Sequence, residues 1–160
     1  MKIKSAKAGV TLFEDASIGL KAEILSPNAS LEYSDLNNYS AVIRLTYGSR
    51  SFLFTGDAEV EAEKIMLDGN YELSADVLKM GHHGSSTSSS DAFLDAVSPK
   101  YAIISCETGN DYGHPHKETL QKLKKRSIET FRTDRQQTII ATCNGTDISF
   151  VTGQQSCNKK

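Results

Sequence analysis

The hydrophobic period of this chain changes between residues 41 and 66, and that change restricts the fold more than any other feature. In residues 41–47 every second side chain falls on one apolar face, which is the period of a half-buried strand. A Gly-Ser-Arg turn then leads into residues 51–55, so the two segments are expected to pair as a hairpin. In residues 58–66 the apolar side chains recur at helical spacing instead. A hairpin that runs directly into a helix is typical of a layered α/β domain.

Strand and helix patterns continue to alternate through the rest of the chain. We expect further strands at 9–13, 21–25, 76–80, 100–105 and 128–131, and further helices at 90–97 and 117–126. Two final strands are joined by Asn144-Gly145, the strongest short hairpin signal. The sequence therefore predicts an α/β fold, with a single domain over residues 1–152 and a flexible polar tail over 153–160.

Polar side chains with metal-binding or catalytic chemistry follow three of the predicted strands. Asp57 comes after the first hairpin, His82 and His83 follow the strand at 76–80, and His114 and His116 lie beyond the strand at 100–105. These four histidines are all that the chain contains. Loops at the carboxyl ends of strands gather ligand sites in α/β sheets, so we expect these loops to meet at one edge.

Asp57 has two interpretations, which the sequence alone leaves open. As the residue between a strand and a helix, it is a good N-cap, because its carboxylate can accept the free N–H groups of the first helical turn. The same carboxylate could instead bind a metal ion. Taken by itself, the position favours the cap.

The adjacent pair His82-His83 is more specific than a lone histidine, which is usually structural. Gly81 and Gly84 flank the pair, so no bulky neighbour crowds a group that binds there. Neutral imidazole is a common protein ligand for zinc and also suits manganese and iron. Because neighbouring side chains usually point apart, we expect one of the two to bind metal and the other to contact substrate.

His114 and His116 flank Pro115, and this arrangement also has two interpretations. Either the segment is a loop-to-helix junction, or one imidazole acts as a general acid for a leaving oxygen. The hydroxyl-rich loop that begins with Ser85 and Ser86 could donate hydrogen bonds to an anionic substrate, although such loops are often only solvated caps.

Three segments, at these spacings and in this order, resemble a known family. They are similar to the closing half of a metallo-β-lactamase-fold domain. The segments are 52–59 (Phe-Leu-Phe-Thr-Gly-Asp-Ala-Glu), 76–85 (with Gly-His-His-Gly-Ser) and 110–116 (with Gly-His-Pro-His). The variant they most resemble lies at the carboxyl end of ComEC-type DNA-uptake (competence) proteins. The resemblance runs from about Ile24 to Phe150.

This resemblance implies an αββα sandwich with a pair of zinc or manganese ions at the edge of two sheets. The present chain would form only the carboxyl-terminal half, with flanking strands. Asp57 and His82 match the family's metal ligands, and His83 lies beside them. From the residues themselves we expect His83 and His114 to be catalytic, and Ser85, Ser86 and His116 to contact the substrate. The implied reaction is hydrolysis of DNA or another phosphodiester, by a nuclease that degrades the strand that is not imported.

The sequence departs from the family pattern in one large respect. The principal metal motif, His-x-His-x-Asp-His, is absent, and no histidine precedes His82. Asp57 and His82 alone are fewer than the three or four protein ligands of a catalytic site. We therefore expect part of a metal-dependent nuclease domain that is inactive by itself and is completed by an amino-terminal half or a second copy. The rival hypotheses are a non-catalytic binding or assembly module, and a hydrolase of thioesters or lactams.

Charge and cysteine content limit the classes of protein to which this chain can belong. The net charge of −2 and the pI near 6.1 lack the basic footprint of a dedicated nucleic-acid binder, which favours the rivals. The basic run at 122–126 is typical of the last turn of a helix. Three cysteines without zinc-type spacing indicate reduced thiols. Without a secretory signal or a run of about 20 apolar residues, we expect a cytoplasmic segment without membrane contact, from a parent that could be membrane-anchored.

Overall fold

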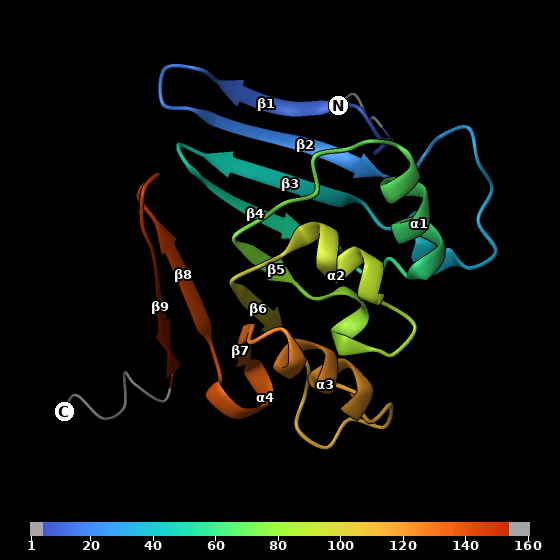
Figure 1. Cartoon of the computed structure of the whole chain (residues 1–160), viewed down its shortest axis with the longest axis vertical. Coiled ribbons are helices and arrows are strands. Elements are labelled where there is room, and N and C mark those ends of the chain that lie inside the picture. Colours follow the sequence, from blue (N-terminus) through green and yellow to red (C-terminus); the bar gives the residue numbers. More distant parts are fainter. Residues whose placement is uncertain (1–4, 154–160) are drawn as a thin grey trace.

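A seven-stranded mixed sheet forms the centre of the computed structural model, which describes residues 5–153 (Figure 1). The strands lie side by side in chain order, and the first four are antiparallel while β4 to β7 are parallel. Their bounds are β1 (Thr11–Asp15), β2 (Leu20–Ser26), β3 (Val42–Tyr47), β4 (Arg50–Phe54), β5 (Val77–Lys79), β6 (Tyr101–Ile104) and β7 (Glu129–Arg132). The last two strands, β8 (Ile139–Cys143) and β9 (Ile148–Thr152), form a separate hairpin.

The three longer helices connect the parallel strands and cover one face of the sheet (Figure 1). Connections between parallel strands are right-handed, and strands in sequential order therefore place every crossover helix on the same face. The helices are α1 (Val60–Asp68), α2 (Asp91–Val97) and α3 (Lys117–Lys125), with a short α4 (Thr133–Gln136) after β7. Two 3₁₀ turns, η1 (Leu36–Tyr39) and η2 (Gly81–Gly84), lie in the loops.

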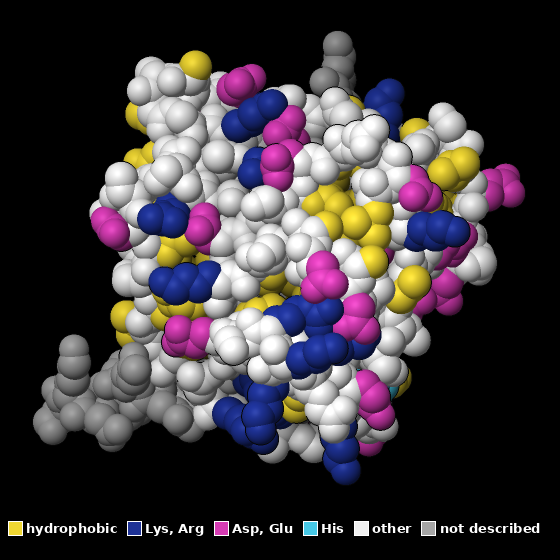
Figure 2. Space-filling view, viewed as in Figure 1, with side chains coloured by type: hydrophobic (Ala, Val, Ile, Leu, Met, Phe, Trp, Pro, Cys, Tyr) yellow, Lys and Arg dark blue, Asp and Glu magenta, His cyan; other side chains and the backbone are white. Residues whose placement is uncertain are grey.

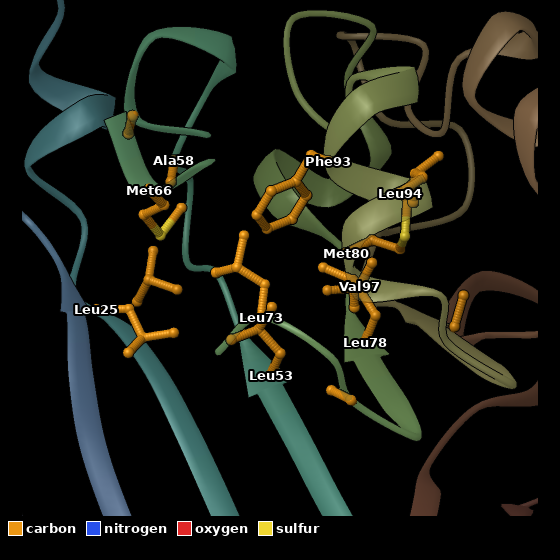
Figure 3. Packing of buried hydrophobic residues seen from close by; sticks show 14 of the residues in the cluster. Leu25, Leu53, Ala58, Met66, Leu73, Leu78, Met80, Phe93, Leu94 and Val97 are labelled. Carbon is orange, nitrogen blue, oxygen red and sulfur yellow. The ribbon is translucent and has the colours of Figure 1, made fainter. Parts of the chain in front are cut away.

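The hydrophobic core lies between these helices and the sheet (Figure 3). Leu53 of β4 and Leu78 of β5 are fully buried and contribute to the same cluster as Phe93, Leu94 and Val97 of α2. Side chains alternate across a strand, so the neighbours of Leu53, Phe52 and Phe54, point to the opposite face.

That opposite face, here called the non-helical face, is only partly covered. Phe150 of β9 lies 4.8 Å from the ring of Tyr101 and 4.4 Å from the ring of Phe131, so the hairpin packs against β6 and β7. Further along the sheet, Phe54 is 41% exposed and Phe13 is 49% exposed. The architecture is the mixed α/β half with flanking strands that the sequence predicts, and residues 5–153 contain no second large sheet.

The predicted capping role of Asp57 is wrong. Helix α1 begins at Val60, and its N-cap residue, Glu59, makes no side-chain cap bond. The acceptor comes from far along the chain: the Oδ1 atom of buried Asn38 accepts the N–H groups of Glu59 (3.0 Å) and Ala62 (3.2 Å). A side chain delivered by η1 therefore replaces the local cap, and this leaves the Asp57 carboxylate available for other contacts.

The predicted elements otherwise match well, apart from α4, which the sequence pattern did not indicate. The basic run at 122–126 does end α3, and Arg126 pairs with Asp91 and Asp95 of α2. Figure 2 shows this mixture of Lys, Arg, Asp and Glu side chains on the helical face. The predicted tail, 153–160, lies outside the described residues except for Gly153. Within residues 5–153, no helix has the length and apolar character required to cross a bilayer.

Candidate functional site

Three loops that the sequence singled out meet at one edge of the sheet. Asp57 follows β4, His82 and His83 follow β5, and His114 and His116 lie in the long loop between β6 and α3. Since β4, β5 and β6 are adjacent and parallel, their carboxyl ends lie together. The expected convergence of these residues is therefore present in the fold.

All four histidines form one group, here called the histidine cluster. The ring of His114 is central: its centroid lies 5.4 Å from that of His82, 6.2 Å from that of His83 and 4.8 Å from that of His116. The rings of His82 and His83 lie 6.2 Å apart. The two neighbours thus both face the cluster, instead of pointing apart as the sequence suggested.

An unusual backbone directs both rings to the same place. His82 (φ 45°) and His83 (φ 56°) occupy the left-handed region, which costs a residue with a side chain roughly 1 to 3 kcal/mol. Gly81 fits closely beside them, because a Cβ there would lie 3.0 Å from the carbonyl oxygen of Ala58. Such strain is concentrated at functional sites, and here it falls on the two residues with the best metal-binding chemistry.

Hydrogen bonds fix the orientation of both imidazoles. The Nδ1 atom of His83 donates to the carbonyl oxygen of Ser105 (2.7 Å), and the Nδ1 atom of His82 donates to Glu59 (3.1 Å). Each ring is thereby left with Nε2 as its basic nitrogen, and His83 Nε2 lies 3.6 Å from Asp57 Oδ1. Metal-binding histidines typically donate their second ring nitrogen to a carbonyl or carboxylate in this way.

Glu59 is a site residue that the sequence analysis missed. Besides accepting a hydrogen bond from His82, its carboxylate accepts one from the hydroxyl of Thr87 (2.6 Å). It so connects the start of α1 to residues 85–90, here called the serine-rich loop. Its place in the first turn of a helix suggested only a favourable interaction with the helix dipole. The contact with His82 depends on the segment before α1, where the carbonyl oxygen of Gly56 accepts the N–H of His82 (3.0 Å).

The donor groups fit part of a metal site but not a complete one. Imidazole nitrogens and a carboxylate are suitable ligands for zinc and manganese. Among residues 5–153, however, no three His, Cys, Asp or Glu side chains are grouped so that they could hold a metal ion. No reaction step can therefore be derived through a metal held by these side chains alone.

The surroundings of the site lower the pKa values of two basic groups, His114 and Lys79. Burial lowers the pKa of His114, and the charges of His116, His82 and His83 lower it further. A neutral imidazole is the form that can bind a metal or accept a proton. Burial also lowers the pKa of Lys79, whereas the nearby Asp57 carboxylate raises it.

The serine-rich loop is held against the histidine cluster from both sides. Ser86 is exposed, and its N–H donates to His116 Nδ1 (2.9 Å). His116 Nε2 in turn donates to the carbonyl oxygen of Tyr112 (3.1 Å), so both ring nitrogens of His116 connect loops. Ser85 is buried, and its hydroxyl pairs with that of Thr87 (2.9 Å).

Glu63 anchors the far end of this loop from inside the core. It is only 2% exposed, and its carboxylate accepts the N–H groups of Ser89 and Ser90, with the Ser90 bond at 2.9 Å. Burial raises the pKa of Glu63, while these hydrogen bonds and the charge of Lys122 oppose the rise. The buried carboxylate thus fixes the start of α2 and, with it, the loop that carries Ser85 and Ser86.

Replacing Glu63 with Gln tests this anchor through its pH dependence. An acid whose pKa is raised on folding stabilises the protein below its unfolded value, near 4.5, and loses that contribution as the pH rises through the folded value. Below pH 4.5 we expect the variant to be about 1 to 3 kcal/mol less stable, because a buried N–H loses its acceptor. The wild-type advantage should shrink with rising pH in urea unfolding. A gap that is independent of pH would contradict the assignment.

Comparisons with known proteins agree on one family. Residues 18–108 match the model of the metallo-beta-lactamase superfamily. The chain is 42% identical over 120 residues to ComE operon protein 3 of Bacillus subtilis, which covers 75% of this chain and 15% of that protein. It is 39% identical over 118 residues to competence protein ComA of Neisseria gonorrhoeae, and this match covers 72% of this chain and 17% of that protein. It is 40% identical over 107 residues to recombination protein 2 of Haemophilus influenzae, and this match covers 67% of this chain and 13% of that protein. The matched region is thus a small part of each relative.

Proposed function

Because this chain belongs to the metallo-beta-lactamase superfamily, we propose that it forms part of a metal-dependent hydrolase domain that cleaves the phosphodiesters of DNA. The observation that carries the proposal is the gathering of Asp57 and the histidine cluster at the carboxyl edge of β4, β5 and β6. Relatives named as competence and recombination proteins support DNA as the substrate, in preference to a thioester or a lactam.

The geometry favours the roles proposed for Asp57 and Ser86 over those of Ser85, which is buried, and His116, whose ring nitrogens both hold loop atoms. Asp57 and His82 would bind metal, and His83 is a second ligand candidate, since its Nε2 atom lies beside Asp57. His83 and His114 are the proposed catalytic residues, and burial and the neighbouring histidines lower the pKa of His114, which favours its neutral form. The proposed substrate-binding residues are Ser85, Ser86 and His116, of which Ser86 is exposed. When bound, zinc or manganese would polarise a phosphoryl oxygen and lower the pKa of water.

The remaining metal ligands have to come from another segment. We assign that role to the amino-terminal half of the domain, which would cover the exposed part of the non-helical face. Phe54, 41% exposed on that face, lies three residues before Asp57, so a segment packed there would reach the site. Because this chain aligns with only 13 to 17% of its relatives' lengths, the activity of a complete protein remains part of the proposal.

Metal analysis of the isolated chain tests the incomplete site. We expect less than one zinc or manganese ion per chain after dialysis, because three or four protein ligands are needed for tight binding. Elemental analysis gives the stoichiometry, and titration calorimetry gives the affinity. An Asp57→Asn variant is the matched control and should remove the weak binding. Tight binding of two ions would contradict the proposal, and a dimer in the same sample would assign the missing ligands to a second copy.

A further inference from the structure

An exposed aromatic ring stands at the rim of the site. Tyr112 is 78% exposed, although an aromatic side chain of this size usually buries much of its surface. Among residues 5–153, the hydroxyl group of Tyr112 has no hydrogen-bond partner. The contact of the Tyr112 ring with the ring of His114 leaves most of the side chain open to solvent.

The ring of Tyr112 is nearly parallel to that of His114, which in turn is nearly parallel to that of His83. Its centroid lies 5.7 Å from that of His114, with 20° between the ring planes. The ring of His114 lies 6.2 Å from that of His83, with 19° between their planes. His83 Nε2 faces Asp57 at 3.6 Å. The rings of Tyr112, His114 and His83 are thus successive neighbours, and the last of them lies beside the carboxylate proposed to bind metal.

The loop that carries Tyr112 is held in place before any ligand binds. The side-chain amide of Asn110 donates to the carbonyl oxygens of Glu107 (2.8 Å) and His114 (2.7 Å), and its oxygen accepts the N–H of His114 (2.9 Å). His116 holds the carbonyl oxygen of Tyr112 (3.1 Å). A platform fixed in this way loses little conformational entropy when a planar group stacks on it.

We infer that Tyr112 is a stacking platform for a nucleobase next to the phosphodiester in the site. The inference rests on the proposed function and names the substrate form that this site selects. A base can place its face on Tyr112 only after it leaves the stack of a duplex, so the site favours single strands and frayed ends. Base–aromatic stacking tolerates any sequence, because every base has a π face.

Binding measurements with the 160-residue chain test this inference without metal or hydrolysis. The probes are a fluorescein-labelled single-stranded oligodeoxynucleotide and an abasic strand of the same length and charge, compared by fluorescence anisotropy at low ionic strength. Tyr112→Ala is expected to weaken binding of the base-bearing strand roughly 5- to 100-fold and to leave binding of the abasic strand unchanged. Tyr112→Phe, the matched control, keeps the ring and should bind both strands as the wild type does.

Three results would overturn the inference. They are equal weakening of both strands in Tyr112→Ala, no weakening of either strand, and a wild-type chain that does not prefer the base-bearing strand. The proposed function is tested by a separate experiment. Full-length protein that does not hydrolyse phosphodiesters would refute it even if stacking is found, whereas hydrolysis that depends on Asp57 with no stacking would refute only the platform.

Discussion

Replacing Asp57 and His82 together with Asn is expected to lower phosphodiester hydrolysis by the full-length protein more than about 100-fold. Loss of groups that merely support a metal ligand already costs about 10- to 100-fold, and this double variant removes two proposed ligands. Asn suits position 82 because it tolerates the left-handed backbone (φ 45°) better than most residues do. Initial rates on a single-stranded oligonucleotide, with bound metal measured in the same samples, give the comparison.

A control variant separates a site effect from an unfolding effect. Asp147→Asn changes an exposed aspartate in the turn between β8 and β9, away from the histidine cluster, and should keep wild-type activity. The melting temperature of the double variant should stay close to that of the wild type, since the Asp57 side chain is 43% exposed. Hydrolysis that survives the double change, in a folded protein, would refute the assignment of these residues.

Phe93→Ala is expected to have the largest effect on stability, a loss of about 3 to 5 kcal/mol in the free energy of unfolding. Phe93 is 1% exposed and lies at the centre of the cluster between α2 and the sheet (Figure 3). Its removal deletes buried apolar surface and leaves a cavity that rigid neighbours fill only partly. Because domains of this size have a free energy of unfolding of about 5 to 15 kcal/mol, the variant would lose much of its total stability.

Phe13→Ala is the matched control for this effect. The same ring is 49% exposed on the edge strand β1, so its truncation should cost about 1 kcal/mol or less. Urea unfolding of the two variants gives both values. A similar cost at the two positions would contradict the core described above.

The sequence predicted the secondary structure well where one period dominates a segment. The alternation in 41–47 and the helical spacing after Asp57 correspond to β3 and α1. The hairpin predicted at Asn144-Gly145 is present, but its turn spans four residues, 144–147, instead of two. The resemblance to the metallo-β-lactamase family and to ComEC-type competence proteins is confirmed by the comparisons. These features are local or are carried by ordered motifs, and a single sequence is enough to show them.

The polar contacts that complete the site were beyond the sequence. Asn38 caps α1 from 21 residues before Glu59, and Glu59 reaches His82 across 23 residues. Glu63 holds Ser89 and Ser90 across 26 and 27 residues. No local pattern encodes such pairs, because they depend on how α1, η1 and the serine-rich loop pack together. The error at Asp57 has the same cause, since a distant side chain took the capping role that local spacing assigned to it.

The sequence by itself determined the α/β class, the loops that carry Asp57 and the four histidines, and the family to which they belong. It did so because hydrophobic period and the order of motifs are properties of neighbouring residues. Only the tertiary structure decided that β4, β5 and β6 are adjacent and parallel, which brings those loops to one edge. It also set the ring of His114 nearly parallel to those of Tyr112 and His83, because ring orientation follows from packing and hydrogen bonds between segments far apart in the chain.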